Sequence, residues 1–266
     1  MSKEKSAWEI VEIARNQKRK TSLDFIEKIF DDFIELHGDR NFRDDKAIVC
    51  GLGSINGEAY TIIAEQKGRT TKENIERNFG MPNPESYRKA IRFMKQAEKF
   101  NRPIITFIDT KGAYPGIGAE ERGQGEAIAK SLFEMSKVRV PTIAIVVGEG
   151  SSGGALAISV ADKIVMLENA IYSILSPEGY SSILWKDSSR YKEAAEKMKL
   201  TAKDLYEMKV IDKIIEEHDD FEKTASSLKK EILDTMKVLK KKDKETLLEE
   251  RYNKYRNMGE YVELGV

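Results

Sequence analysis

The sequence predicts an α/β fold around a largely parallel sheet, because strands alternate with helices through the middle of the chain. Two β-branched runs, 104–110 and 142–147, are typical of buried strands. Each leads into a glycine-rich turn, at 111–118 and at 148–154. The second turn opens a predicted helix, so free N–H groups and the positive end of a helix dipole should meet there. Such an arrangement binds a phosphate or an oxyanion without a charged side chain.

Composition narrows the class of protein. With 266 residues, 40% of them hydrophobic, the chain can build a core and is not expected to be disordered. Its 45 Lys and Arg residues balance 45 Asp and Glu residues, which argues against nucleic-acid binding. No apolar run approaches the ~20 residues of a membrane span, and residues 1–12 do not resemble a signal region. We therefore expect a cytoplasmic protein that binds no membrane.

The N-terminal region is predicted to be helical from Ala7 to about Leu36, with a break at the basic run 16–20. Thr21 or Ser22 is a candidate cap for the second helix. The apolar face of that helix comprises Leu23, Ile26, Ile29, Phe30, Phe33 and Ile34.

Two strands are predicted next, at 47–52 and 59–64, on either side of Asn56-Gly57, a strong hairpin signal. The single cysteine, Cys50, lies in the first strand and is expected to be a buried core thiol. One cysteine also excludes an internal disulfide and a multi-cysteine zinc site in this chain. A long polar loop is expected over 65–85.

The remaining elements follow from periodicity and caps. Helices are predicted over 87–100 and 121–137, from Gly153, after Ser176-Pro177, after Thr201 and from Asp220 onward, with a break at 240–244. Strands are predicted at 163–167, 171–175 and 211–215. This pattern divides the chain into an α/β core at 43–217 and two helical arms, 1–42 and 218–266, which we expect to serve packing or assembly.

The second turn also fits the dinucleotide fingerprint G-x-G-x-x-G through Gly148, Gly150 and Gly153, with Glu168 near the position of a ribose-binding carboxylate. The short crossover helix that follows and the position in mid-chain argue against this interpretation. The glycines could also serve only to let a helix pack closely.

The same turn fits the nucleophile elbow G-x-S-x-G over 150–154, with Ser152 as the nucleophile. A catalytic triad then requires a histidine. The chain has two, His37 before the core and His218 in an acidic run, so the pattern gives this hypothesis little support.

A third candidate cluster is the basic segment 66–82, which carries Arg69, Lys72 and Arg77. Cations there attract phosphate or carboxylate groups if they face a cleft. Charge runs are usually solvated surface, but a long loop in a compact domain is often functional.

These three segments, followed by 176–185, closely resemble the α-subunit family of bacterial acetyl-CoA carboxylase carboxyltransferases. The likeness covers nearly the whole chain. Its matching stretches are 39–40, 44–49, 77–82, 119–124 and 251–252. It implies a ClpP/crotonase-like fold, a spiral of ββα units, flanked here by helical N- and C-terminal arms. Two departures are Lys111, where the family usually has proline, and Ser151, where it commonly has glycine; neither looks disabling.

The resemblance implies a transferase that moves the carboxyl group of carboxybiotin, held on the biotin carboxyl carrier protein, to acetyl-CoA. The product is malonyl-CoA for fatty acid biosynthesis. It also implies a β subunit of related fold that carries the family's zinc ribbon, an α2β2 heterotetramer, and biotin carboxylase in the wider complex. Biotin is covalently attached to the separate carrier, and no metal is expected in this chain.

By the same resemblance, the N–H groups of Gly153 and Gly154 form an oxyanion hole for the biotin ureido oxygen, and the β subunit supplies the hole for the thioester oxygen. The biotin anion can take the methyl proton itself, so no protein base is obligatory. The residues that we expect to line the substrate and biotin site are Gly112, Ala113, Tyr114, Gly150, Ser152, Lys111, Arg69, Lys72 and Arg77.

Other functions stay open at this point. Within the fold, the chain could transfer a carboxyl group to another acyl-CoA, or catalyse hydration or decarboxylation with Glu120, Glu121 or Glu149 as positioned carboxylates. Outside it, a nicotinamide-dependent oxidoreductase and a non-catalytic scaffold are the alternatives.

Overall fold

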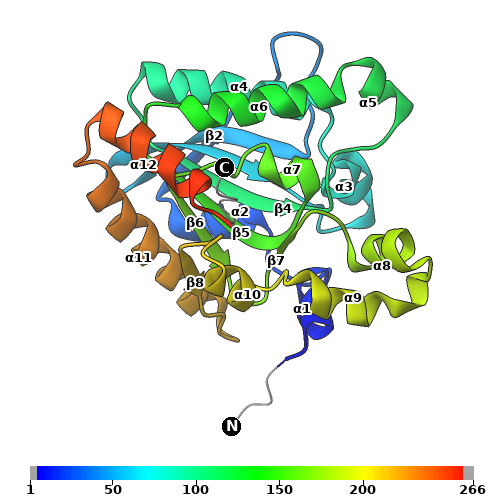
Figure 1. Ribbon diagram of the computed structural model, residues 1–266. Helices are drawn as coiled ribbons and strands as arrows, with labels where there is room; N and C mark the ends of the chain where they lie inside the picture. The colour runs from blue at the N-terminus through cyan, green and yellow to red at the C-terminus, as the bar shows by residue number, and fades with distance from the viewer. Residues whose placement is uncertain (1–4, 260–266) are drawn as a thin grey trace, which may run out of the picture.

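The computed structural model describes residues 5–259; residues 1–4 and 260–266, which include the start of the chain and parts of both predicted arms, lie outside the described residues. The described chain forms an eight-stranded sheet (Figure 1). Its strands are β1 (Asp32–Glu35), β2 (Ile48–Ile55), β3 (Glu58–Glu65), β4 (Ile104–Thr110), β5 (Thr142–Ser151), β6 (Lys163–Leu167), β7 (Ile171–Ser173) and β8 (Lys213–Ile215).

The strands lie in the order β1-β2-β3-β4-β5-β6-β8, and β7 pairs with β5 off this path. The β1–β2 and β2–β3 pairings are antiparallel. Every other pairing, from β3–β4 onward, is parallel. The predicted α/β fold with a largely parallel sheet is therefore confirmed, and β4 and β5, the strands that lead into the glycine turns, are neighbours.

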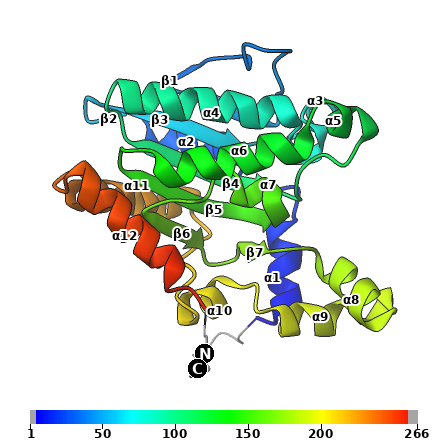
Figure 2. The same cartoon turned by 45° about the horizontal axis from the view of Figure 1, so that its top comes forward.

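Helices cover the sheet in layers. α4 and α6 lie side by side over one face, and α2 and α11 pack together on the other side, whereas α1, α8 and α9 form a separate group at one end (Figures 1 and 2). The helices are α1 (Ala7–Ala14), α2 (Ser22–Ile29), α3 (Thr71–Glu76), α4 (Pro84–Lys99), α5 (Ile117–Glu121), α6 (Gln124–Lys137), α7 (Ser152–Leu156), α8 (Pro177–Trp185), α9 (Tyr191–Met198), α10 (Ala202–Glu207), α11 (Phe221–Leu239) and α12 (Lys244–Arg256), with 3-10 turns η1 (Asn78–Gly80) and η2 (Ser188–Arg190). None of the helices within residues 5–259 is long and apolar enough to cross a membrane.

The prediction of a helix that continues to Leu36 is wrong. α2 ends at Ile29, and the chain turns into strand β1, where Phe33 pairs with Gly53 and Ile34 with Leu52. Pairing with the edge of β2 gives this segment backbone hydrogen bonds that decide its conformation, because an apolar run fits a helix face and a strand equally well.

The hairpin prediction is confirmed, since Asn56 and Gly57 connect β2 to β3 with φ angles of 51° and 80°. The prediction of an unstructured loop over 65–85 is wrong in part. Thr70 caps α3 by accepting a hydrogen bond from the Glu73 N–H, and η1 follows directly.

Both terminal arms contribute to the main core. Phe25 and Ile26 of α2, and Leu228 and Ile232 of α11, are buried with the central strands. Cys50 is fully buried in β2, as predicted, and burial raises the pKa of its thiol to about 12. The core and arm boundaries remain a prediction.

α12 is held by a buried arginine. The Arg251 guanidinium binds both carboxylate oxygens of Asp162, at 2.8 and 3.0 Å. It also donates to the carbonyl oxygens of Met135 and Ser136 in the last turn of α6, each at 3.3 Å, and to that of Val138, at 2.7 Å. The arginine thus satisfies backbone groups that the end of α6 leaves without an intrahelical partner.

Candidate active site

The two glycine turns lie against each other at the carboxyl ends of β4 and β5. A Cβ atom on Gly154 would lie 2.6 Å from the Ala113 nitrogen and 2.8 Å from the Gly112 carbonyl carbon. Gly112 itself has φ +125°, a conformation that favours glycine. The close approach of the turns depends on the absence of a side chain at Gly154.

The extent of the second turn differs from the prediction. Residues from Gly148 to Ser151 belong to strand β5, whose end pairs with β7 through Glu149, Gly150 and Ser151. The turn itself is made by Ser152, which has φ 58°, and α7 begins there. Pairing with β7 extends β5, because it satisfies backbone groups that a free turn would leave to solvent.

The protein itself uses some of the N–H groups of the two turns and leaves others without an acceptor. In the first turn, the Gly112 N–H donates to Thr110 Oγ1 and the Tyr114 N–H donates to the Pro82 carbonyl oxygen, each at 3.0 Å. Within residues 5–259, the Ala113 N–H has no hydrogen-bond acceptor. No side chain caps α7, so the N–H groups of its first turn also lack an intrahelical partner. The role of the Gly153 and Gly154 N–H groups as an oxyanion hole remains a prediction.

The structure does not support the dinucleotide-binding fingerprint or the nucleophile elbow. Gly148 and Gly150 lie inside a strand, whereas a dinucleotide fingerprint needs its glycines in the turn. Ser152 is exposed and has the left-handed backbone of a nucleophile elbow, but no histidine serves it. His37 pairs with Asp44, and the backbone N–H of His218 donates to Thr224.

The basic segment is bound mostly to the protein itself. Arg69 pairs with Asp24 of α2 at 2.9 Å, and Arg77 donates to the Lys46 carbonyl oxygen at 2.7 Å. Lys72 on α3 and Lys111 in the first turn are exposed. Their roles toward substrate remain predictions.

The end of the basic segment has an unusual backbone. Asn78, Phe79 and Gly80 have φ angles of 50°, 56° and 77°. Such conformations are costly for a bulky residue such as Phe79 and persist only where the surroundings enforce them. Here Asp45 accepts from Asn78 Nδ2 at 3.2 Å, and Thr110 Oγ1 donates to the Gly80 carbonyl oxygen at 2.5 Å.

Sequence reasoning missed a buried charged cluster behind the turns. Asp109 and Glu149, which are 4% and 3% exposed, meet Lys67, and Glu149 also pairs with Arg15 at 3.0 Å. Glu65 accepts from the Asp109 N–H at 3.1 Å. Burial raises the pKa of Glu65 well above its ordinary range, although that hydrogen bond opposes the shift. The signal that could have revealed the cluster is Asp109 itself, a carboxylate inside an apolar strand.

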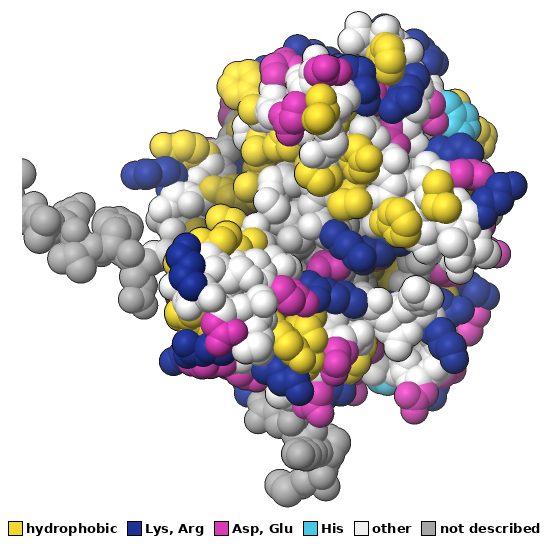
Figure 3. Space-filling model, turned by 90° about the vertical axis from the view of Figure 1, so that its right-hand side faces the viewer, with side chains coloured by type: hydrophobic (Ala, Val, Ile, Leu, Met, Phe, Trp, Pro, Cys, Tyr) yellow, Lys and Arg dark blue, Asp and Glu magenta, His cyan; other side chains and the backbone are white. Residues whose placement is uncertain are grey.

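Four exposed apolar side chains, which we call the apolar rim, lie next to the turns in the chain or on segments that contact them. They are Phe79, Ile117, Leu156 and Ile174, exposed by 47%, 80%, 39% and 76%. Figure 3 shows hydrophobic side chains gathered on this side of the molecule. Exposed apolar groups that gather around a functional site are typical of a surface that another protein covers.

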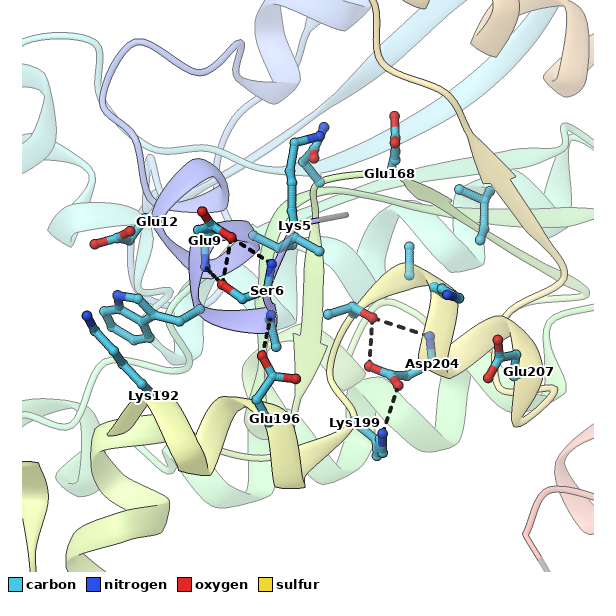
Figure 4. Close-up of a pocket in the computed structure, with 18 of the residues that line it drawn as sticks. Lys5, Ser6, Glu9, Glu12, Glu168, Lys192, Glu196, Lys199, Asp204 and Glu207 are labelled. Atoms are coloured by element: carbon cyan, nitrogen blue, oxygen red, sulfur yellow. Dashed lines mark hydrogen bonds and ion pairs between the residues drawn. The ribbon is translucent and has the colours of Figure 1, made fainter. Parts of the chain in front are cut away.

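Three cavities of the structure lie away from the two glycine turns. One of about 1460 Å³ lies between α1, α9 and α10, where Glu9, Glu196 and Asp204 line it (Figure 4). Two others, of about 360 and 430 Å³, lie beside α2 and α11 and beside β1. No residue of the two glycine turns lines any of the three. Within residues 5–259, no group of three or more His, Cys, Asp and Glu side chains could hold a metal ion.

Comparison with known proteins places the chain in a family. The family model described as acetyl co-enzyme A carboxylase carboxyltransferase-like matches residues 1–259. A relative from Clostridium beijerinckii, the acetyl-coenzyme A carboxylase carboxyl transferase subunit alpha, is 61% identical over 259 residues, which cover 96% of this chain and 95% of that protein. The subunit of the same name from Staphylococcus haemolyticus is 58% identical over 261 residues, covering 96% and 83%.

Among solved structures, the chain is similar to transcarboxylase 12S with methylmalonyl-coenzyme A and methylmalonic acid bound. The TM-score is 0.72 at 20% identity, over 97% of this chain and 47% of that one. The chain thus spans about half the length of this structural neighbour, whose likeness supports the fold. The predicted crotonase-like fold is confirmed by such carboxyltransferase neighbours. On the match to the family model and on these identities, the chain belongs to the acetyl-CoA carboxylase carboxyltransferase family.

Proposed function

We propose that this chain acts as the carboxyltransferase α subunit of acetyl-CoA carboxylase, which transfers the carboxyl group of carboxybiotin to acetyl-CoA and gives malonyl-CoA. The observation that carries the proposal is the contact between the two glycine turns. At this contact the Gly154 position has no room for a side chain, and the Ala113 N–H has no acceptor among the described residues. The relatives named above, which are 61% and 58% identical to the chain, support the substrate assignment.

The chemistry fits donors of this kind. Carboxybiotin supplies the carboxyl group when its carrier is bound, and its departure leaves negative charge on the ureido oxygen. Fixed N–H groups stabilise such a charge without having to reorganise, and one oxyanion donor is worth about 10²–10³ in rate. The N–H groups of Gly153 and Gly154 would hold that oxygen, with Ala113 as a further donor. Gly112, Tyr114, Gly150 and Ser152 would line the site.

The site needs a second protein to enclose it. The turns line none of the three cavities, and the apolar rim around them is exposed. A closed site that excludes water is required to keep CO₂ beside an enolate. We therefore propose a β subunit as the partner, with the thioester oxyanion hole and a zinc site on that subunit, in an α2β2 assembly. The biotin carboxyl carrier protein and biotin carboxylase complete the cytoplasmic complex.

Hydration by this site is not favoured. Glu149 is held by Arg15 and Lys67, and Glu120 and Glu121 are exposed. A hydratase needs carboxylates aimed at the substrate with freedom to exchange a proton. Carboxyl transfer to another acyl-CoA is the alternative that a substrate comparison would test.

The deciding experiment is the reverse reaction, malonyl-CoA-dependent carboxylation of biocytin, with this chain alone, with the β subunit alone and with both. We expect turnover only with both, because each subunit is proposed to supply one oxyanion hole. An assembled pair that shows no turnover with malonyl-CoA would contradict the proposal, and turnover by this chain alone would contradict the shared site.

A further inference from the structure

A buried ion pair lies directly behind the two glycine turns. Lys67 Nζ lies 2.6 Å from Asp109 Oδ1 and 3.8 Å from Glu149 Oε2. Asp109 is near the end of β4 and Glu149 near the end of β5, the strands that lead into the turns. We propose that Lys67 is a positioning residue for the carboxyl transfer proposed above. Its ammonium group holds the ends of the two strands together and so keeps the N–H groups of both turns aimed at one place.

The backbone ladder does not make this connection. β4 and β5 pair regularly up to Ile108 and Val146, but the next pair is Thr110 with Gly150, so β5 has extra residues at this point. A side chain bridges the irregularity, since the Glu149 N–H donates to Asp109 Oδ1 at 3.0 Å. The carboxylate fits between the strands because Gly148 has no Cβ; one there would lie 2.3 Å from Asp109 Oδ1.

Lys67 neutralises the charge that this arrangement buries. Arg15 pairs with Glu149, but Lys67 is the one cation within residues 5–259 that forms an ion pair with Asp109. Glu149 Oε2 has no hydrogen-bond partner in the same part of the chain, and the Lys67 ammonium group lies 3.8 Å from it. Removing one member of a buried pair leaves an uncompensated charge. Without Lys67, the carboxylate that links the strands would be drawn toward water.

Lys67 also contacts the support of the first turn. A Cβ on Gly80 would lie 2.6 Å from Lys67 Cγ, so the lysine stem packs against the left-handed turn. The Gly80 carbonyl oxygen accepts from Thr110 Oγ1, and that hydroxyl accepts from the Gly112 N–H. One side chain thus reaches both the link between the strands and the anchor of the first turn.

The test uses the assembled complex and the reverse reaction. Lys67→Met keeps the length of the side chain and removes its charge. We expect kcat to fall about 100-fold, as a displacement of about 1 Å in a catalytic group can cause, with the KM for malonyl-CoA within about threefold of the wild type. Lys67→Arg keeps a cation and should recover most of kcat. The matched control is Lys95→Met on α4, which loses an exposed ion pair with Glu134 at 3.7 Å and should leave kcat unchanged.

A double variant tests whether the loss of activity in Lys67→Met comes from the uncompensated charge of Asp109. Asn in Asp109→Asn can still accept the Glu149 N–H, so Lys67→Met combined with Asp109→Asn should be faster than Lys67→Met alone. If Lys67→Met does not assemble, the assembled double variant decides by its own kcat, which the inference expects to be retained. The inference is overturned if Lys67→Met keeps kcat within about threefold of the wild type, or if the double variant is inactive. An inactive wild-type complex would instead contradict the proposed function.

Discussion

At the scale of single residues, the geometry of the candidate site depends on two glycines that have no side chain. Gly154 admits the backbone of the first turn, and Gly148 admits the Asp109 carboxylate. The N–H groups of Gly112 and Tyr114 are used within the protein, whereas the Ala113 N–H between them has no acceptor among the described residues. Glycine here sets the distance between two loops, and that distance places the donors.

Gly154→Ala should therefore lower kcat of the assembled complex about 100-fold or more, since one lost or displaced oxyanion donor costs that much. The added Cβ would lie 2.6 Å from the Ala113 nitrogen and would push the turns apart. The control is Gly125→Ala in α6, where nothing lies within 4 Å of the added atom and activity should not change. Steady-state kinetics of the reverse reaction measures both. Near-normal activity of an assembled Gly154→Ala complex would remove these turns from the site.

The sequence could predict that two glycine turns follow adjacent strands, because β-branched runs and glycines are local signals. It could not predict which N–H groups stay free. That depends on Pro82 and Thr110, whose positions relative to the turns are set by tertiary packing. The Asp109–Lys67 pair was missed for the same reason, since the basic segment resembles a solvated charge run until its partner is known.

At the scale of elements, boundaries were predicted well where a cap or a turn residue marks them. Ser176 caps α8 and Thr201 caps α10, as their motifs indicate. The misassigned segment, 32–35, has no such marker between the end of α2 and β1. The extension of β5 to Ser151 was hidden because its partner β7 comes later in the chain. Strand partners distant in sequence decide these cases.

The attachment of α12 gives a prediction at this scale. Arg251→Met should lower the free energy of unfolding by about 3–5 kcal/mol, because it leaves a buried carboxylate and several carbonyl groups without their donor. Arg139→Met, which removes an exposed pair with Glu245 on the same helix, should cost less than about 1 kcal/mol. Urea unfolding of the isolated chain compares them. Equal losses would show that the buried arginine is not what secures α12.

At the scale of the whole molecule, the position of the exposed apolar side chains indicates where a partner could bind. The sequence predicted the core but not the apolar rim, because Ile117 or Ile174 resembles any core residue until the fold leaves it at the surface. Three observations agree with a surface that a second protein covers. The apolar rim is exposed, the turns are open, and they line none of the cavities described above. In the function proposed above, the chain would form part of a site and offer the apolar rim to a partner.

Ile117→Ser tests whether the apolar rim binds the β subunit. Because the side chain is 80% exposed, we expect the free energy of unfolding of the isolated chain to change by less than about 0.5 kcal/mol. Binding of the β subunit should weaken about tenfold, equivalent to about 1.4 kcal/mol. The control is Val238→Ser, which should bind normally. Val238 is 58% exposed on α11, a helix that lies on the opposite side of the molecule from α5 in Figure 1. Calorimetric titration measures the affinities; equal binding would place the partner elsewhere.

The burial of Cys50 provides a natural reporter of opening of the fold. The thiol lies in the middle of β2, paired with Ile63, and its raised pKa, about 12, leaves almost no thiolate at neutral pH. A thiol reagent can reach it only when the sheet opens, so its labelling rate reports how often that happens. Because the chain has 1 cysteine, a second one placed by mutation on the surface would react alone in the folded protein. A surface cysteine near the glycine turns could therefore carry a fluorescent label. In the same molecule, the slow labelling of Cys50 would report unfolding.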